Sequence, residues 1–150
     1  MALCVRKCWF SPKTCVEKCK HLTISCVEKC KAMKRKIYKE LVDWKNREQH
    51  KPLILNGVRQ CGKTYILKEF GRNEFDNLAY ISCDRNESLH AIYAGDCDTA
   101  RIIRGLSALT GVDIIPGKTL IFLDEVQAFP QALEALKYFC EDAPEYHIVV

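Results

Sequence analysis

Glycine, lysine and threonine lie at the spacing of a phosphate-binding loop in the run Gly57-Val58-Arg59-Gln60-Cys61-Gly62-Lys63-Thr64. Gly57 and Gly62 allow close approaches that a Cβ would obstruct, so successive backbone N–H groups can converge on a phosphate. Lys63 adds a cation for the β- and γ-phosphates of a nucleotide, and the Thr64 hydroxyl can bind Mg²⁺. The alternative, a chance match, is expected about once in a few hundred chains of this size. The predicted nucleotide-binding residues are Gly57, Val58, Arg59, Gln60, Cys61, Gly62, Lys63, Thr64 and Tyr65.

A second run, residues 119–125, is an apolar segment that ends in the two carboxylates Asp124 and Glu125, the arrangement called Walker B. Asp124 would hold Mg²⁺ directly or through water, and Glu125 would orient and deprotonate an attacking water. An Asp-Glu pair can also simply cap the next helix, but behind a phosphate loop it indicates nucleotide hydrolysis. We therefore predict Glu125 and Lys63 as catalytic residues and Thr64 and Asp124 as metal ligands.

These side chains need a strand before the loop and a helix behind it. Residues 52–56 are predicted as a short buried strand, and residues 65–70 as part of a helix that begins near Lys63 and stops at Gly71. The positive end of the helix dipole would then face the phosphates. The motif therefore has the strand and helix context that its chemistry requires.

The rest of the core alternates strands with helices. Residues 78–83, 119–125 and 146–150 are predicted as the second, third and fourth strands, with a turn at Pro116 and Gly117. Asp98 should cap a helix over residues 99–110 that Gly111 ends, and Pro130 should open the next helix. The predicted inward residues of these helices are Ile102, Ile103, Leu106 and Leu109, then Leu133, Leu136 and Cys140. This alternation predicts an α/β fold, a three-layer core with a mainly parallel sheet.

From about residue 35 onward the chain resembles the AAA-type P-loop ATPases of bacteria and archaea, in which a compact core precedes a separate C-terminal domain. The residues that carry the resemblance are Arg35-Lys36-Ile37-Tyr38 with Leu41 and Trp44, then 52–64, 120–127 and Leu136-Lys137-Tyr138-Phe139. Within them, Arg59-Gln60 and Asp124-Glu125-Val126-Gln127 are the runs typical of this family. The resemblance implies ATP and Mg²⁺ as ligands, and ATP hydrolysis.

The resemblance also implies that the first strand lies beside the fourth, so that a missing fifth strand would leave the first at an open edge. The chain stops at residues 147–150, within the strand whose end should carry a polar sensor residue. We therefore expect a domain truncated after the fourth core strand, with oligomer or partner contacts made by the missing C-terminal part. A nucleotide-gated interaction module, or a gene fragment that binds ATP without productive hydrolysis, is the alternative function.

Residues 1–32 form a basic, cysteine-rich extension, and residues 33–150 the ATPase domain. Three Cys-x3-Cys pairs recur every eleven residues in the extension, at Cys4 and Cys8, Cys15 and Cys19, and Cys26 and Cys30. On a helix each pair would share one face. A metal site, a stripe of small apolar residues, and a tandem duplication with Met33 as an internal start are the three interpretations.

Charge is divided unevenly along the chain. Residues 1–51 hold 14 Lys and Arg against 5 Asp and Glu, for +9, and residues 52–150 hold 9 against 14, for −5. The basic part would suit nucleic acid or an anionic surface, and a solvated face is the alternative. No apolar run reaches the roughly 18 residues of a membrane span, and no signal peptide is recognisable. We therefore expect a cytoplasmic protein whose ten cysteines are free thiols.

Upstream of the first strand, Ile37, Leu41 and Trp44 follow helical spacing. A helix that covers the core is the first interpretation, and one that contacts adenine is the second. His50, His90 and His147 have no Cys or carboxylate partners at a metal-binding spacing, so they are predicted as structural or exposed residues.

Overall fold

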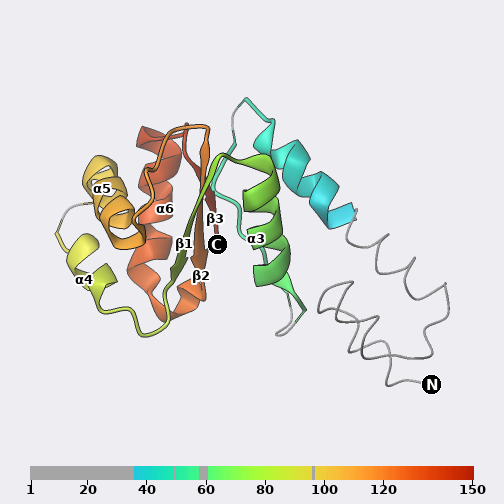
Figure 1. Ribbon diagram of the computed structural model, residues 1–150. Helices are drawn as coiled ribbons and strands as arrows, with labels where there is room; N and C mark the ends of the chain where they lie inside the picture. Colours follow the sequence, from blue (N-terminus) through green and yellow to red (C-terminus); the bar gives the residue numbers. More distant parts are fainter. Residues whose placement is uncertain (1–35, 49, 58–60, 96) are drawn as a thin grey trace, which may run out of the picture.

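The computed structural model describes residues 36–48, 50–57, 61–95 and 97–150, and the predicted N-terminal extension lies outside them. Residues 36–45 are helical. The labelled elements are α3 (Lys63–Glu74), β1 (Asn77–Ser82), α4 (Ser88–Ile92), α5 (Thr99–Thr110), β2 (Thr119–Asp124), the 3₁₀ turn η1 (Val126–Ala128), α6 (Pro130–Asp142) and β3 (His147–Val149) (Figure 1). No helix in the described ranges is long and apolar enough to cross a membrane.

The sheet is parallel and has the order β1-β2-β3. β1 pairs with β2 from Asn77 opposite Thr119 to Ser82 opposite Asp124. Both strands therefore end at the same level, because Ser82 and Asp124 are register partners at their carboxyl ends. Ligands bind at this edge of open α/β sheets.

The segment before the phosphate loop joins the sheet beside β3, as expected, but not as a buried strand. Leu53 forms one parallel bridge with Val149, supported by hydrogen bonds from Leu53 N to Ile148 O (2.8 Å) and from Leu55 N to Val150 O (2.8 Å). Ile54 is 55% exposed. The prediction of burial was wrong because this segment lies at the sheet edge, with a partner on one side only among the described residues.

Helices lie on both sides of the sheet (Figure 1). On one side, α3 and the helix over residues 36–45 bury Leu41, Trp44, Leu67 and Phe70 against Phe122 and Val149. On the other side, α4, α5 and α6 cover a second cluster around Ile81, Ile102, Ile121 and Phe139. The helix over residues 36–45 is thus a covering element of the core, which was its first interpretation.

Helix α5 begins and ends where its caps predict. The Asp98 side chain accepts a hydrogen bond from Ala100 N (3.1 Å), and Gly111 ends the helix with φ 67°. Three of the four predicted inward residues are buried, but Leu109 is 37% exposed. It lies in the last turn of α5.

Helix α6 begins at Pro130 as predicted, but a different face is buried. Leu136 is buried as expected, whereas Leu133 is 38% exposed and Cys140 is only half-buried. The small residues Ala132 and Ala135 take the inward positions with Phe139. These two alanines are buried in the same cluster as Ile102 and Ile121, an inward position that their modest hydrophobicity does not predict.

Helix α3 begins at Lys63 as predicted but continues past Gly71 to Glu74. Gly71 is buried inside the helix, and a Cβ there would lie 2.7 Å from Leu78 Cδ1 and 3.1 Å from Leu120 Cδ2. The glycine therefore permits close packing of α3 on the sheet. The predicted stop at Gly71 was wrong because a glycine can lie inside a helix to permit close packing, as well as end one.

Candidate functional site

The phosphate loop leads from the sheet edge into α3. Gly62 has φ 87°, a left-handed conformation that favours glycine, and it directly precedes the helix. Gly57 lies at the other end of the loop, where a Cβ would come within 3.4 Å of Cys61 Sγ. Val58, Arg59 and Gln60 lie outside the described residues. Gly62 thus has the glycine-favoured backbone that the sequence predicted for the loop.

Lys63 lies in the first turn of α3, and its side chain extends back along the loop. Its Nζ donates a hydrogen bond to Gly57 O (2.7 Å) and lies 3.9 Å from Cys61 Sγ. The ammonium group therefore lies between the two described ends of the loop, Gly57 and Cys61, where it could pair with a phosphate. Tyr65, the last predicted contact residue, is 45% exposed on the same turn.

Thr64 and Asp124 meet across the site. The Thr64 hydroxyl donates to Asp124 Oδ2 at 3.1 Å, which joins the first turn of α3 to the last residue of β2. Asp124 is half-buried, and its other oxygen, Oδ1, accepts a hydrogen bond from Glu125 N (3.1 Å). The two predicted metal ligands are therefore neighbours.

Glu125 follows β2 directly and is exposed. Its backbone has φ 54°, a left-handed conformation that is uncommon for a residue with a side chain and often marks a functional site. The Glu125 carboxylate accepts a hydrogen bond from the Gln127 side chain in η1. The predicted catalytic carboxylate thus lies at the carboxyl edge of the sheet, beside Asp124.

Tyr80 belongs to this cluster, although the sequence analysis did not single it out. Its hydroxyl donates to Asp124 Oδ2 at 3.1 Å. Burial raises the pKa of Tyr80, and the nearby Asp124 charge raises it further. Strand alternation places Tyr80 on the same face of β1 as Leu78, opposite the buried Ala79 and Ile81. The alternation along β1, combined with the expectation that β1 and β2 are parallel strands of one sheet, could have identified Tyr80 from the sequence.

The cysteines near the site differ in environment. Cys61 is half-buried in the phosphate loop, whereas Cys83, just after β1, is buried. Burial raises the pKa of the Cys83 thiol to about 11, with a further contribution from the Asp124 charge. Cys83 is therefore an unreactive core residue.

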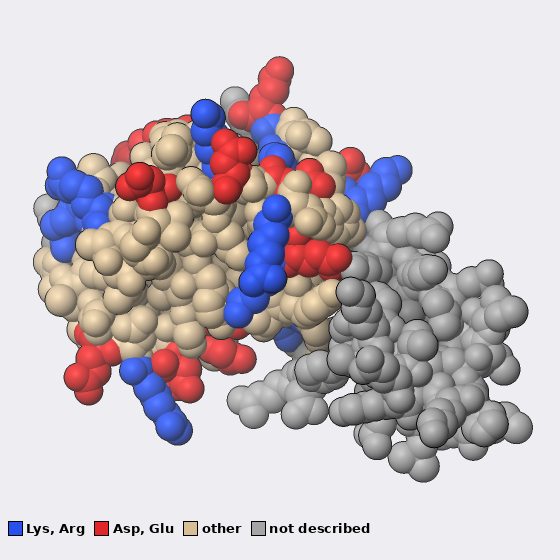
Figure 2. Space-filling view, viewed as in Figure 1, with Lys and Arg blue, Asp and Glu red and all other residues tan. Residues whose placement is uncertain are grey.

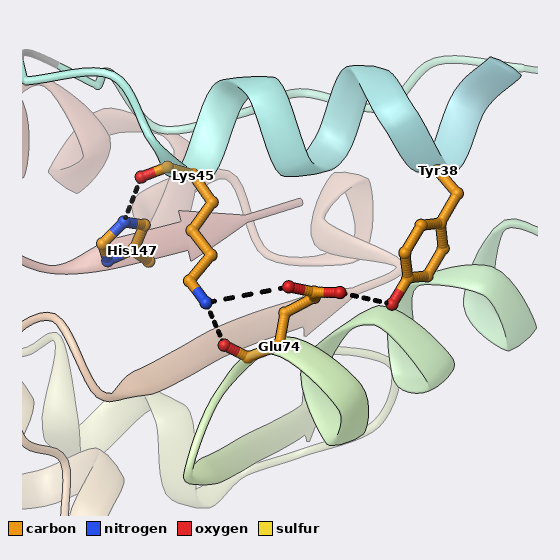
Figure 3. Close-up of polar contacts among 4 residues, drawn as sticks. All are labelled: Tyr38, Lys45, Glu74 and His147. Atoms are coloured by element: carbon orange, nitrogen blue, oxygen red, sulfur yellow. Dashed lines mark hydrogen bonds and ion pairs between the residues drawn. The ribbon is translucent and has the colours of Figure 1, made fainter. Parts of the chain in front are cut away.

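The helix over residues 36–45 is tied to the end of α3 and to β3 (Figure 3). Tyr38 Oη donates to Glu74 Oε1 (2.9 Å), and Lys45 Nζ donates to Glu74 O and lies 3.9 Å from Glu74 Oε2. His147 Nε2 lies 3.2 Å from Lys45 O, so this ring nitrogen carries the proton. These contacts attach the helix to the core on the side away from Asp124.

The predicted structural histidines include a stacked pair. His50 and His147 have ring centroids 3.7 Å apart with an angle of 11° between the planes, and Trp44 packs edge-on against both. His147 is 6% exposed, whereas His90 is exposed and lies edge-on to Phe129. No group of three or more His, Cys, Asp or Glu residues that could hold a metal occurs in the described part of the chain.

A parallel α/β sheet with a glycine loop at its carboxyl edge defines a nucleotide-binding class of protein. Comparison with protein families supports this class, because a family described as an AAA domain matches residues 49–150, about two thirds of the chain. The chain belongs to this family of AAA-type P-loop ATPases, and nucleotide binding is the function that membership indicates. Comparisons with curated proteins and with solved structures gave no match.

Proposed function

We propose that this protein binds ATP with Mg²⁺ and hydrolyses it. The observation that carries the proposal is the 3.1 Å hydrogen bond from Thr64 to Asp124, which joins the phosphate loop to the end of β2. Lys63 lies on the same turn of α3 and would neutralise the β- and γ-phosphates. The backbone N–H groups at the start of α3 would bind the same phosphates.

The two oxygen donors of Thr64 and Asp124 suit Mg²⁺ rather than a softer metal. Magnesium is usually held by one or two protein oxygens together with substrate phosphates and water, and it does not need a cluster of carboxylates. When bound, Mg²⁺ would screen the charge of the phosphates during hydrolysis. Hydrogen bonds to both of its oxygens hold the Asp124 carboxylate in place, which supports this proposed role.

Glu125 is the proposed general base. It follows Asp124 directly, and its left-handed backbone directs the chain into η1 instead of continuing the strand. Its carboxylate would accept the proton of a water positioned near the γ-phosphate. Because Gln127 donates to this carboxylate, Gln127 must release or share it during the reaction.

The hydrogen bond between Gln127 and Glu125 also favours a second function, a nucleotide-gated interaction module. In that case the amide keeps the carboxylate engaged, and ATP changes contacts with a partner without productive hydrolysis. The two functions differ in turnover but share the same binding site.

We also propose a three-layer core that spans residues 33–150. The family match begins at residue 49, after the helix over residues 36–45. Leu41 and Trp44 of this helix are only 3% and 4% exposed, which supports its inclusion in the core. A chain lacking residues 1–32 should then bind ATP as the full chain does, measured by titration calorimetry. A large loss of affinity would place the extension within the functional domain.

Replacing Glu125 tests the hydrolysis step. Glu125→Gln should keep ATP and Mg²⁺ bound but lower phosphate release by at least about 100-fold, because an amide cannot take the proton of water. Phosphate release and ATP binding are measured on the same samples, with Glu134→Gln on the exposed face of α6 as a control. Unchanged turnover in Glu125→Gln would assign the base to another residue, and a wild type that binds ATP without turnover would support the interaction module.

A further inference from the structure

The Tyr80 hydroxyl forms a hydrogen bond with Asp124, although the side chain is exposed enough to bond water instead. Its side chain lies at the surface, 36% exposed, so its hydroxyl could bond water at little cost. Instead it donates to Asp124 Oδ2 at 3.1 Å, the same oxygen that accepts the Thr64 hydroxyl. With Glu125 N on Oδ1, three donors hold the Asp124 carboxylate in one orientation.

The ring of Tyr80 is itself held from two sides. Lys68 Nζ lies 3.4 Å from the ring centroid, a cation–π contact, and the Phe122 ring lies 5.4 Å away at an angle of 59°. Lys68 is one helical turn beyond Thr64 on α3, and Phe122 is the register partner of Tyr80 on β2. The elements that carry the two predicted metal ligands therefore also fix the tyrosine.

We propose that Tyr80 is a positioning residue for the metal-binding carboxylate of Asp124. This inference rests on the proposed Mg²⁺-dependent nucleotide site. The hydroxyl fixes the rotation of the Asp124 side chain about its Cβ–Cγ bond, so that the carboxylate need not be ordered when Mg²⁺ arrives with the nucleotide. Partners that orient a metal ligand typically contribute 10- to 100-fold in metal affinity or activity.

The test compares ATP affinity in Mg²⁺ with ATP affinity in EDTA, by calorimetry on the full chain. The ratio of the two affinities is the magnesium gain. Tyr80→Phe should lower the magnesium gain by about 10-fold, while the affinity in EDTA and the melting temperature stay at the wild-type values. The melting temperature is included because a merely structural role would change it and leave the magnesium gain unaltered.

Tyr138→Phe is the matched control, since Tyr138 is similarly exposed (39%) and lies on α6. Its magnesium gain should equal that of the wild type. Lys68→Met, which removes the charge above the Tyr80 ring, should lower the gain by a smaller factor. An unchanged gain in Tyr80→Phe, or an equal fall in Tyr138→Phe, would overturn the inference. A wild type with no magnesium gain would overturn the proposed Mg²⁺ dependence itself, and with it this role.

Discussion

Thr64 and Asp124 are separated by 60 residues in the chain, yet their side chains are joined by one hydrogen bond. Each owes its position to the end of a regular element, since Thr64 lies in the first turn of α3 and Asp124 ends β2. Lys63 and Glu125 are their immediate neighbours in sequence. Two short runs are thus sufficient to bring a cation, a hydroxyl and two carboxylates to one edge of the sheet.

At this residue scale, Cys61 offers a chemical probe of the loop. Cys61 is half-buried, and its Sγ lies 3.9 Å from Lys63 Nζ, in the loop that we propose to hold the phosphates. Maleimide modification of Cys61 should therefore block ATP binding, and bound ATP should protect Cys61 from labelling, as mapped by mass spectrometry. Cys61→Ala should bind ATP and resist the reagent.

Cys140, half-buried on α6, is the control thiol in the same experiment. Its labelling should not depend on ATP. Equal labelling of Cys61 with and without ATP would contradict the predicted occupancy of the loop.

At the scale of elements, the close approach of α3 to the sheet depends on Gly71. An alanine in a helix is normally about 1 kcal/mol more favourable than glycine, but here its Cβ would lie 2.7 Å from Leu78 and 3.1 Å from Leu120. Overpacking of this kind costs about 1–3 kcal/mol. We therefore expect Gly71→Ala to lower the free energy of unfolding by up to about 2 kcal/mol, measured with denaturant.

Leu78→Ala would make room for the new methyl group. In that background Gly71→Ala should cost less than in the wild type, because only the 3.1 Å contact with Leu120 Cδ2 remains to oppose the helix preference. An equal loss of unfolding free energy in the wild-type and Leu78→Ala backgrounds would mean that the contact with Leu78 does not limit how closely α3 packs on the sheet.

The stacked pair His50 and His147 joins the segment before Leu53 to β3. His147 Nδ1 and His50 Nε2 are buried and have no hydrogen-bond partner in the described structure. Burial lowers the pKa of His147 to about 4; the hydrogen bond to the Lys45 carbonyl acts in the opposite direction, and the charges of His50 and Lys45 lower it. Glu74, which pairs with Lys45, is the acidic group of this region. The His147 ring therefore packs as a neutral group.

A pH titration of stability tests this packing. Because the pKa of His147 is lower in the folded protein than its ordinary value of 6.5, the unfolded chain binds the proton more tightly. The contribution of neutral His147 to the free energy of unfolding is fully present above about pH 6.5. It is lost as the pH falls toward 4, which lowers the free energy of unfolding by roughly 3 kcal/mol. His147→Phe should keep the stack but lack this part of the pH dependence. Parallel curves for the two proteins would contradict the buried, neutral state.

At the scale of the whole molecule, the sequence predicted what local chemistry determines. The caps Asp98 and Gly111 fixed both ends of α5, and the alternation of elements predicted the parallel sheet. Features that depend on distant neighbours were not predicted. The exposure of Ile54 beside Leu53, the packing role of Gly71 and the contact of Tyr80 with Asp124 all arise from residues far apart in the chain.

The distribution of surface charge favours a nucleotide site that depends on a few local groups over one that depends on a broad basic surface. Basic and acidic side chains are interspersed over the described face in Figure 2, and neither sign forms a continuous patch there. Residues 52–150 carry a net charge of −5, so the net charge of this part does not attract an anion such as ATP. The proposed affinity for ATP must therefore come from local groups, namely the loop, the start of α3 and the proposed cation.

The measurement that tests the central claim most directly is calorimetric titration of the full chain with ATP in the presence of Mg²⁺. The wild type should bind one ATP per chain, and Lys63→Ala should bind it about 10- to 100-fold more weakly, because the phosphates lose a charged hydrogen-bond donor. Lys137→Ala, an exposed lysine on α6, should bind as the wild type does. Equal affinity in the wild type and in a folded Lys63→Ala protein would contradict the assignment of this loop as the nucleotide site.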